Sequence, residues 1–504
     1  MSDSDTETFH GDIVVGSRII DYLSSGLYES PASCLKELVN NSYDADAKTV
    51  HVLVKPDADT IAIEDDGLGM TKDDFVRHFG RISESYKREG NDHTPSGRPK
   101  IGKIGIGFIA ANELCDVMEI YSTVKGSEEL LHVVIDFGVM RNPDDLRRVE
   151  GDEEGFKKGD YAGEVSLDVA ASEHFTKIYL KKIRGPARES LVGAAPPLPD
   201  MRAQTIYGLR PETIRDRLAN LDTWSSLDDY SRTRLGVALN VPVAYPERWV
   251  PESSEGEVSR FTKRIDGLGF EVIYDGSRLE KPVVLDEQRD RPGHLLRTYK
   301  FEGERVALEG YLFARHGILK PTEMNGVLIR IRNAAVGEYV RDFIDFPSGT
   351  GQLFQRWVSG EIYADDRLEE ALNIDRKTLR ETHPAYVELK QWLHATLTSF
   401  LSETRNVLYQ RSSEERAVVR TERSAKAIRD VADAASKRIS PEVGNAIRNA
   451  WTPEPTAKKA ETKRFDRNYS VAEFYDIATE IAAEVLPAEQ AAAFIEALNR
   501  RLSG

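Results

Sequence analysis

The pattern of hydrophobic and polar positions divides the chain into regions of different character. Apolar residues recur at roughly helical spacing from Ile19 to Leu38, which predicts an amphipathic helix. Short alternating or apolar runs predict strands at 50–54, 60–63, 117–121, 131–137 and 177–180. The polar stretch 71–100 between them predicts a long loop or lid. Residues 1–183 therefore form one predicted α/β unit.

A second unit is predicted after a stretch without periodicity. Proline and glycine in residues 184–205 indicate a linker or an irregular insertion. Residues 206–404 mix helical spacing with strand-like runs, and they end in regularly spaced leucines from Leu389 to Leu408 that predict a long amphipathic helix. We therefore expect an α/β middle domain over 206–404.

Residues 405–504 form a predicted helical C-terminal region. The stretch 402–468 contains 15 Lys and Arg residues and 10 Asp and Glu residues, which gives it a net charge of +5 in a chain whose total charge is −16. Such charge-mixed helices are commonly solvated, and a net positive segment also suits nucleic acid. This segment could therefore be a solvated arm or a nucleic-acid contact.

Composition excludes several classes of protein. The 504 residues correspond to roughly three domains at about 150 residues each. Two cysteines, Cys34 and Cys115, rule out a disulfide framework and a four-cysteine zinc site. The acidic start MSDSDTETFH does not resemble a signal peptide, and no run of about 18 apolar residues occurs, so we expect no membrane span and a cytoplasmic location.

The first candidate site is the segment ELVNNSYDA, residues 37–45. On a helix, Glu37, Asn41 and Asp44 lie at i, i+4 and i+7 and share one face. A carboxylate there can deprotonate a water molecule, and an amide oxygen suits Mg²⁺ that is bound together with phosphates. Taken alone, the motif is equally compatible with a solvated helix face.

The second motif is EDDGLGM, residues 64–70. Asp65 stands at the end of a predicted strand, and Gly67 and Gly69 follow, where the backbone can turn sharply or approach a flat ligand. A carboxylate in this position can accept a hydrogen bond from an exocyclic amino group such as that of adenine. Taken alone, an acidic β-turn or a calcium-type loop explains the pattern as well.

The third motif is GKIGIGF, residues 102–108, followed by an apolar stretch. A glycine-rich loop before a helix presents backbone N–H groups to an anion, here from Gly102, Gly105 and Gly107. The motif lacks the Gly-Lys-Ser/Thr ending of the P-loop and the acidic residue of a dinucleotide site.

Together, in this order and spacing, the three motifs resemble the boxes of the GHKL ATPases, which include gyrase, heat-shock chaperones, histidine kinases and MutL proteins. The stretch from Phe175 to Ile178, with Thr176 entering a strand, resembles the fourth box. The resemblance implies an α+β protein: a GHKL (Bergerat) α/β sandwich that binds ATP, then an α/β middle domain and a helical C-terminal tail.

The resemblance also implies roles for single residues. Glu37 would be the general base that activates water, and Asn41 would be the ligand of Mg²⁺. Asp65 would bind the adenine amino group, with Thr176 supporting it through water. The remaining cofactor contacts implied for ATP are Asp44, Gly67, Gly69 and Met70 around the base, and Gly102, Gly105 and Gly107 around the phosphates.

A residue of the second unit is implied as well. The segment 354–379 is similar to the middle-domain segment of HtpG-like chaperones that supplies an arginine to the γ-phosphate, and the matching residue is Arg376. Such an arginine would stabilise charge on the transferred phosphoryl group. Lys320 and Arg332 are rival candidates, and an ordinary surface arginine is the alternative reading of Arg376.

Two functional classes follow. The first is an ATP-hydrolysing, nucleotide-gated, chaperone-like clamp, expected to form a homodimer and to bind a protein client. The alternative is a DNA-handling GHKL ATPase of MutL or MORC type, with nucleic acid bound through 402–468. A nucleotide sensor without hydrolysis is a third option, which an intact Glu37 disfavours. A histidine kinase is disfavoured because such kinases usually lack the Asn-x-x-Asp-Ala continuation found here from Asn41 to Ala45. Their phosphate-accepting histidine also lies on a helix before this domain, for which the stretch before residue 37 is expected to be too short.

Overall fold

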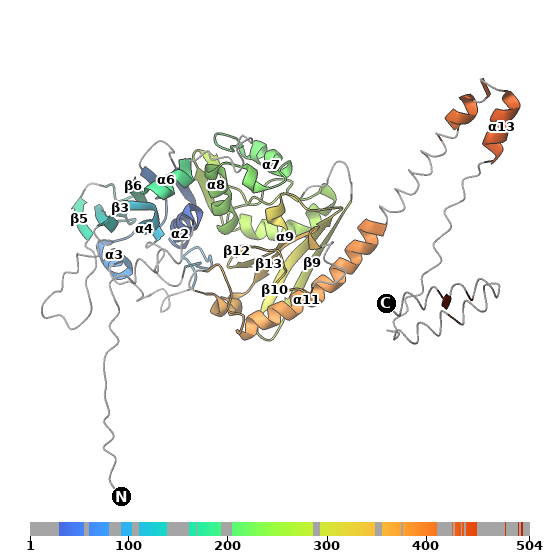
Figure 1. Cartoon of the computed structure of the whole chain (residues 1–504). Helices are drawn as coiled ribbons and strands as arrows, with labels where there is room; N and C mark the ends of the chain where they lie inside the picture. Colours follow the sequence, from blue (N-terminus) through green and yellow to red (C-terminus); the bar gives the residue numbers. More distant parts are fainter. Residues whose placement is uncertain are drawn as a thin grey trace, which may run out of the picture. The chain divides into compact units, whose positions relative to one another are not determined.

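A computed structural model describes most of residues 30–410 and parts of the chain beyond them (Figure 1). The described ranges are 30–54, 60–79, 92–102, 110–138, 161–167, 169–192, 204–285, 293–347, 355–373, 376–410 and, farther on, 426, 429–434, 436–437, 440–450, 479, 492 and 495–496. Residues 1–411 group into one compact unit and residues 412–504 into another.

The first sheet has eight strands and is mixed. Its order is β5 (Tyr161–Leu167), β4 (Glu129–Asp136), β3 (Cys115–Thr123), β6 (Phe175–Ile183), β2 (Thr60–Asp65), β1 (Thr49–Val54), β7 (Glu271–Tyr274) and β8 (Ser277–Arg278). Strands β1 and β7 run parallel, and every other neighbouring pair is antiparallel. The last two strands therefore come from beyond the predicted linker and complete the sheet of the N-terminal region.

Helices cover one face of this sheet. They are α2 (Pro31–Asp44), α3 (Lys72–Phe79), α4 (Ala111–Leu114), α6 (Gly185–Val192) and α8 (Asp229–Asn240). Alternate residues of β3 and β6 point into the layer between, where Met118 and Leu180 join Leu38 of α2 in one core. The helix α6 occupies 185–192, the first part of the stretch 184–205 that the sequence predicts as a linker or an irregular insertion. The α+β sandwich expected for this region is thus present.

The second sheet has five strands in the order β12 (Ala334–Val340), β11 (Gly326–Ile331), β13 (Val358–Ala364), β10 (Ala307–Arg315) and β9 (His294–Glu302). Strands β11 and β13 are parallel. Leu389, Leu393 and Leu397 of α11 (Pro384–Thr404) pack on one core of this sheet, while Phe261 of α9 (Glu255–Asp266) belongs to another. A second α/β layer is therefore present, as the fold class predicts, although α8 and the strands β7 and β8 from within residues 206–404 belong with the first sheet.

The other described helical elements of the first unit are α7 (Pro211–Ala219), the π-helical turn η7 (Arg405–Gln410), and the 3₁₀ turns η3 (Trp224–Ser226), η4 (Glu252–Ser254), η5 (Thr322–Met324) and η6 (Asp366–Ala371). The second unit contains α13 (Pro441–Ala450). Within the described residues, no helix is both long enough and apolar enough to cross a membrane.

Candidate functional site

Helix α2 carries the first motif. It begins at Pro31, a residue suited to the first helical position, and the hydroxyl of Ser30 caps it by accepting a hydrogen bond from the Ser33 N–H at 3.3 Å. The apolar positions Leu35, Leu38 and Val39 are fully buried against the sheet. This packing leaves Glu37 and Asn41, one turn apart, on the partly exposed side of the helix.

The side chains of Glu37 and Asn41 are available to a ligand. The Glu37 side chain is 17% exposed. Its Oε1 lies 3.9 Å from the Nζ of Lys36, with which it forms an ion pair. Among the described residues, none donates a hydrogen bond to the Glu37 carboxylate or holds the Asn41 amide. A carboxylate and an amide oxygen of this kind can hold and deprotonate a water molecule beside a phosphate-bound metal ion.

Asp65, at the end of β2, is a buried carboxylate held by two short hydrogen bonds. The Ser42 hydroxyl donates to Oδ2 at 2.7 Å, and the Gly67 N–H donates to Oδ1 at 2.9 Å. Burial raises the pKa of Asp65 to about 6, although these hydrogen bonds oppose the rise. The group is therefore mostly ionised at neutral pH and can accept a further hydrogen bond.

The glycine turn after Asp65 packs closely against neighbouring backbone. Gly69 has φ +73°, and a Cβ atom there would stand 1.9 Å from the carbonyl oxygen of Thr123. The ring of His174 binds the turn from the other side, because its Nδ1 lies 2.7 Å from the Gly67 carbonyl oxygen and donates to it. Only glycine fits at position 69, which is the physical reason for the second motif.

Thr176 belongs to a small hydroxyl cluster beside this turn. Its Oγ1 lies 3.0 Å from the Ser122 Oγ, and Ser122 also accepts a hydrogen bond from the Met70 N–H at 2.9 Å. Met70, Thr176 and Ser42 belong to the sequence motifs, but the sequence indicates no role for Ser42, and Ser122 and His174 lie outside the motifs. Serine and histidine carry no signal of their own in such surroundings, so the contacts of these three residues are evident only from the tertiary structure.

Asp44 is engaged with the start of the third motif. Its two carboxylate oxygens accept the N–H groups of Ile101 and Gly102 at 2.7 and 2.8 Å. The first and third motifs are therefore joined directly, and Asp44 lies beside Gly102, the first glycine of the third motif. Gly105 and Gly107 lie outside the described residues.

The turn that follows η6 carries two cations, Arg376 and Lys377. Arg376 has φ +52°, and its Nη1 lies 3.8 Å from Oε1 of the buried Glu369. Burial raises the pKa of the Cys34 thiol, and the positive charge of Lys377 opposes that rise. Lys377 therefore lies close enough to act on α2 one turn before Glu37, a proximity that the sequence does not reveal.

The two rivals of Arg376 are bound elsewhere. The Lys320 ammonium lies 2.6 Å from Asp222 Oδ1. The Arg332 side chain is 1% exposed and is surrounded by the carboxylates of Asp366, Glu369 and Asp92. Neither group is free to bind a phosphate in this arrangement.

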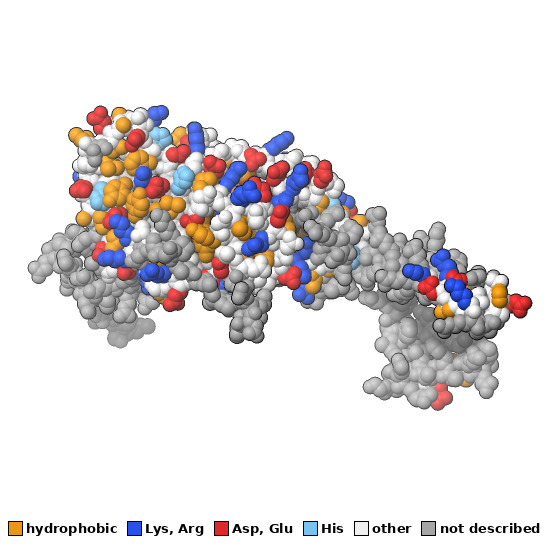
Figure 2. Space-filling model, turned by 90° about the horizontal axis from the view of Figure 1, so that it is seen from above, with side chains coloured by type: hydrophobic (Ala, Val, Ile, Leu, Met, Phe, Trp, Pro, Cys, Tyr) orange, Lys and Arg blue, Asp and Glu red, His pale blue; other side chains and the backbone are white. Residues whose placement is uncertain are grey.

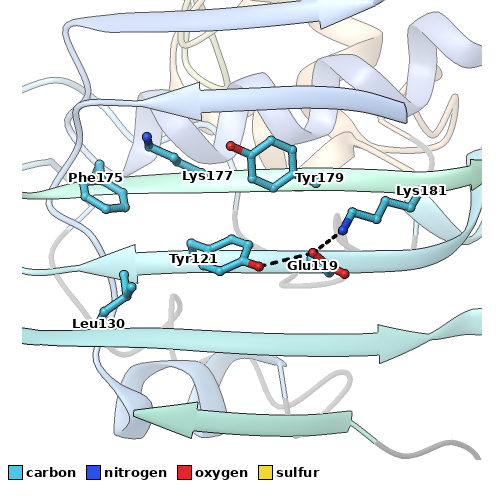
Figure 3. Close-up of a pocket in the computed structure, with 7 residues that line it drawn as sticks. All are labelled: Glu119, Tyr121, Leu130, Phe175, Lys177, Tyr179 and Lys181. Carbon is cyan, nitrogen blue, oxygen red and sulfur yellow. Dashed lines mark hydrogen bonds and ion pairs between the residues drawn. The ribbon is translucent and has the colours of Figure 1, made fainter. Parts of the chain in front are cut away.

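A separate cavity of about 460 Å³ lies on the other face of β3 and β6 (Figure 3). It is lined by Glu119, Tyr121, Leu130, Phe175, Lys177, Tyr179 and Lys181. These side chains alternate with the buried core positions, so they point away from α2. Figure 2 shows hydrophobic side chains gathered over this end of the molecule. The cavity is distinct from the cluster around Asp65.

The side chains fit a magnesium ion that comes with a polyphosphate. In the described part of the chain, no three His, Cys, Asp or Glu side chains converge into a metal site. Mg²⁺ takes few protein ligands and relies on substrate phosphates and water, so one amide oxygen beside a carboxylate that accepts no hydrogen bond from the described residues is a suitable donor set. Asn41 is the side chain that meets this requirement.

Comparison with known proteins agrees with this geometry. Residues 28–153 match a family model described as histidine kinase-, DNA gyrase B- and HSP90-like ATPase. This part of the chain is therefore a domain of the GHKL type by sequence.

Two kinds of protein are among those similar to this chain. Chaperone protein HtpG of Bacillus subtilis (strain 168) is 33% identical over 134 residues, and that of Methylobacterium sp. (strain 4-46) is 34% identical over 137 residues; each alignment covers 22% of this chain. The "Putative type II restriction enzyme HgiDII" of Herpetosiphon aurantiacus is 23% identical over 399 residues, 76% of this chain. The chain spans about a fifth of the HtpG proteins and about half of HgiDII, 21–22% and 54% respectively.

Proposed function

We propose that this protein binds ATP with Mg²⁺ and hydrolyses it to ADP and phosphate. The observation that carries the proposal is that no described residue donates a hydrogen bond to the Glu37 carboxylate or holds the Asn41 amide on one face of α2, which also contributes Ser42 to the buried Asp65 carboxylate. The helix α2 thus carries both the candidate base, Glu37, and the candidate metal ligand, Asn41, and it contacts the candidate purine site at Asp65 through Ser42.

Each residue has a chemical task in this proposal. Asp65 accepts a hydrogen bond from the adenine amino group, and the turn at Gly67, Gly69 and Met70 lines the base. Glu37 takes the proton of the attacking water. Asn41 holds the metal ion, which neutralises charge on the phosphates when it is bound.

The second sheet supplies positive charge in this proposal. Arg376 would leave Glu369 and reach the terminal phosphate, where a cation stabilises the charge of the transferred group. Lys377, the next residue, is the competing candidate because its charge already acts on α2. Hydrolysis would then depend on how the second sheet sits against the first.

The direct test is the purified full chain with ATP and magnesium. We expect phosphate release that requires magnesium and is inhibited by ADP. A chain that binds neither ATP nor ADP would overturn the proposal. A chain that binds both and releases no phosphate would be a nucleotide sensor, which also contradicts hydrolysis.

For the biological role we propose a nucleotide-gated clamp, expected to work as a cytoplasmic homodimer. The chaperone-like form of this role rests on the HtpG relatives, whose similarity covers 22% of the chain. The expected result is ATP-dependent dimerisation together with ATP-dependent binding of an unfolded protein.

DNA handling is the second candidate role, and the length of one match favours it. The relative named as a restriction enzyme aligns with 76% of this chain, so its similarity extends beyond the ATPase domain. The net charge of +5 over 402–468 offers a place for nucleic acid.

A DNA-binding assay at two salt concentrations separates the two roles. DNA handling predicts binding that weakens by about 10-fold or more between about 50 and about 200 mM salt. The exposed residues Lys426 and Arg429 would be replaced by glutamate in the full chain, with Arg305→Glu and Arg341→Glu as a charge-matched control. Equal DNA binding by both variants, or none by the wild type, would contradict this role.

A further inference from the structure

Arg332 is an unusual residue for its position. It forms, with Asn333, the two-residue turn between β11 and β12, and both have positive φ, +52° and +68°. Asn-Gly and related pairs suit such a turn, whereas a long side chain is disfavoured. The geometry of the turn therefore gives no reason for an arginine at this position, whereas the contacts of the Arg332 side chain do.

The Arg332 guanidinium joins the second sheet to residues 92–102, which we term the anchor segment. Its Nη1 donates to the Lys100 carbonyl oxygen at 2.5 Å, and its Nη2 lies 3.5 Å from Asp92 Oδ2. On the other side it binds Asp366 with two hydrogen bonds, at 2.9 and 3.1 Å. Paired hydrogen bonds of this kind fix direction as well as distance.

The anchor segment is tied to the end of α2 by separate contacts. Asp46 accepts hydrogen bonds from the hydroxyls of Thr94 and Ser96, at 2.6 and 2.5 Å. Arg98 donates to the Ala47 carbonyl oxygen at 2.5 Å. Asp44 of α2 accepts the N–H groups of Ile101 and Gly102, the two residues after Lys100. The position of Gly102 is therefore fixed both by α2 and, through Lys100, by Arg332.

Glu369 connects the same arginine to the turn at 376–377. Its Oε2 lies 3.2 Å from Arg332 Nε, and its Oε1 lies 3.8 Å from Arg376 Nη1. The carboxylate is 8% exposed, so both ion pairs are shielded from water and are stronger than surface pairs. One buried acid therefore contacts the cation that holds the anchor segment and the cation proposed for the phosphate.

We propose that Arg332 is a positioning residue that couples the anchor segment to the turn at 376–377. The proposal rests on the function proposed above. Arg332 contacts the phosphate side of the site, through Lys100 and Glu369, and it does not contact the cluster around Asp65. Loss of the side chain should therefore reduce turnover far more than it reduces affinity for ADP.

The test uses the full chain with Arg332→Ala, Arg332→Lys and the control Arg367→Ala. Arg367 directly follows Asp366 in the sequence and is also held by acidic side chains, those of Asp365 and Glu302. Its other hydrogen bonds go to the carbonyl oxygens of Gly303 and Glu304, and it has no contact with the anchor segment. Hydrogen exchange of residues 92–102, kcat and KM for ATP, and the Kd for ADP are measured for each.

For Arg332→Ala we expect exchange in the anchor segment to accelerate about tenfold, and kcat to fall about tenfold, with the Kd for ADP within about twofold of wild type. In Arg332→Lys, we expect both the exchange rate and kcat to lie between those of Arg332→Ala and the wild type, since one ammonium can replace some of the contacts. The control should leave exchange and kcat unchanged.

Two results would overturn the coupling. The first is wild-type exchange and kcat in Arg332→Ala. The second is exchange that accelerates equally in β2 and the anchor segment, which would mark a purely structural role. Should Arg332→Ala fail to fold, Asp366→Asn, at a 57% exposed side chain, must lower kcat in the same direction or the proposal fails. If the wild type does not bind ADP, the proposed function is refuted. Hydrogen exchange of residues 92–102 in Arg332→Ala would then still test whether Arg332 holds the anchor segment.

Discussion

The hydroxyl of Ser42 donates a hydrogen bond to Asp65 at 2.7 Å, joining α2 to the end of β2 across 23 positions of sequence. Ser42 follows Asn41 in the first motif, and Asp65 is the acid of the second. Because of this contact, the helix that carries the candidate base also fixes the orientation of the carboxylate proposed to bind adenine. The relationship makes the two halves of the site mutually dependent.

Asp65→Asn should abolish tight nucleotide binding. An amide cannot accept the adenine amino hydrogen bond as a charged oxygen does, and we expect affinity for ADP to fall by about 10-fold to 100-fold. Calorimetric titration with ADP measures the change. Glu64→Gln is the matched control, because Glu64 pairs with Tyr179 and Lys177 on the other face of the sheet; unchanged affinity in Asp65→Asn would remove Asp65 from the adenine site.

Protonation of Asp65 should weaken nucleotide binding in mild acid. Its pKa is raised to about 6, so the carboxyl becomes neutral as the pH falls below that value and loses acceptor strength. We expect the Kd for ADP to rise between about pH 7 and about pH 5 in the wild type. The Asp65→Asn variant should lack this dependence, and an equal dependence in both proteins would assign it to another group.

The same pKa predicts how stability changes with pH. The folded state binds the Asp65 proton more tightly than the unfolded chain, where the usual value is 3.8, so this group's contribution falls as pH rises from about 4 to about 6. The loss is at most about 3 kcal/mol. Urea unfolding of wild type and Asp65→Asn at both pH values measures it, and parallel pH profiles for the two proteins would contradict the prediction.

Glu37→Ala should retain ATP binding and lose turnover. Removing a general base costs about 100-fold to 10,000-fold in rate, and the side chain does not contact the cluster around Asp65. Phosphate release and ADP titration measure the two properties separately. Glu113→Gln, at an acid held by Arg184, serves as the control. Hydrolysis that persists in Glu37→Ala would exclude Glu37 as the base.

Arg376→Ala should slow hydrolysis by about tenfold or more while ADP affinity stays near that of wild type, since the proposed contact is with the terminal phosphate. Lys377→Ala is tested beside it, because the two residues compete for this role. Lys320→Ala, which removes an exposed ammonium paired with Asp222, is the control. A normal rate in Arg376→Ala with a low rate in Lys377→Ala would transfer the role to Lys377.

The local parts of the site could be predicted from the sequence. The spacing of Glu37, Asn41 and Asp44 predicts one helix face, and a helix covers all three. The strand before Asp65 is also present, and Gly69 has the positive φ that only glycine tolerates well there. These features depend on residues a few positions apart, whose relative placement is set by the period of the helix or strand.

Contacts between distant segments came only from the tertiary structure. The binding of Asp44 to Ile101 and Gly102, the hydroxyl of Ser42 on Asp65, and the His174 ring on the glycine turn leave no pattern in the chain. Their residue types are common in helices and strands, and their partners lie from 23 to 107 positions away.

The sequence by itself indicated which segments form the candidate nucleotide site and in what order, because each motif encodes its own local geometry. The tertiary structure decided how the site is completed. Strands β7 and β8 close the first sheet from residues 271–278, and Arg332 reaches Lys100 from 232 positions away. Such placements follow from the packing of two sheets against shared helices, which depends on the whole core and not on any single motif.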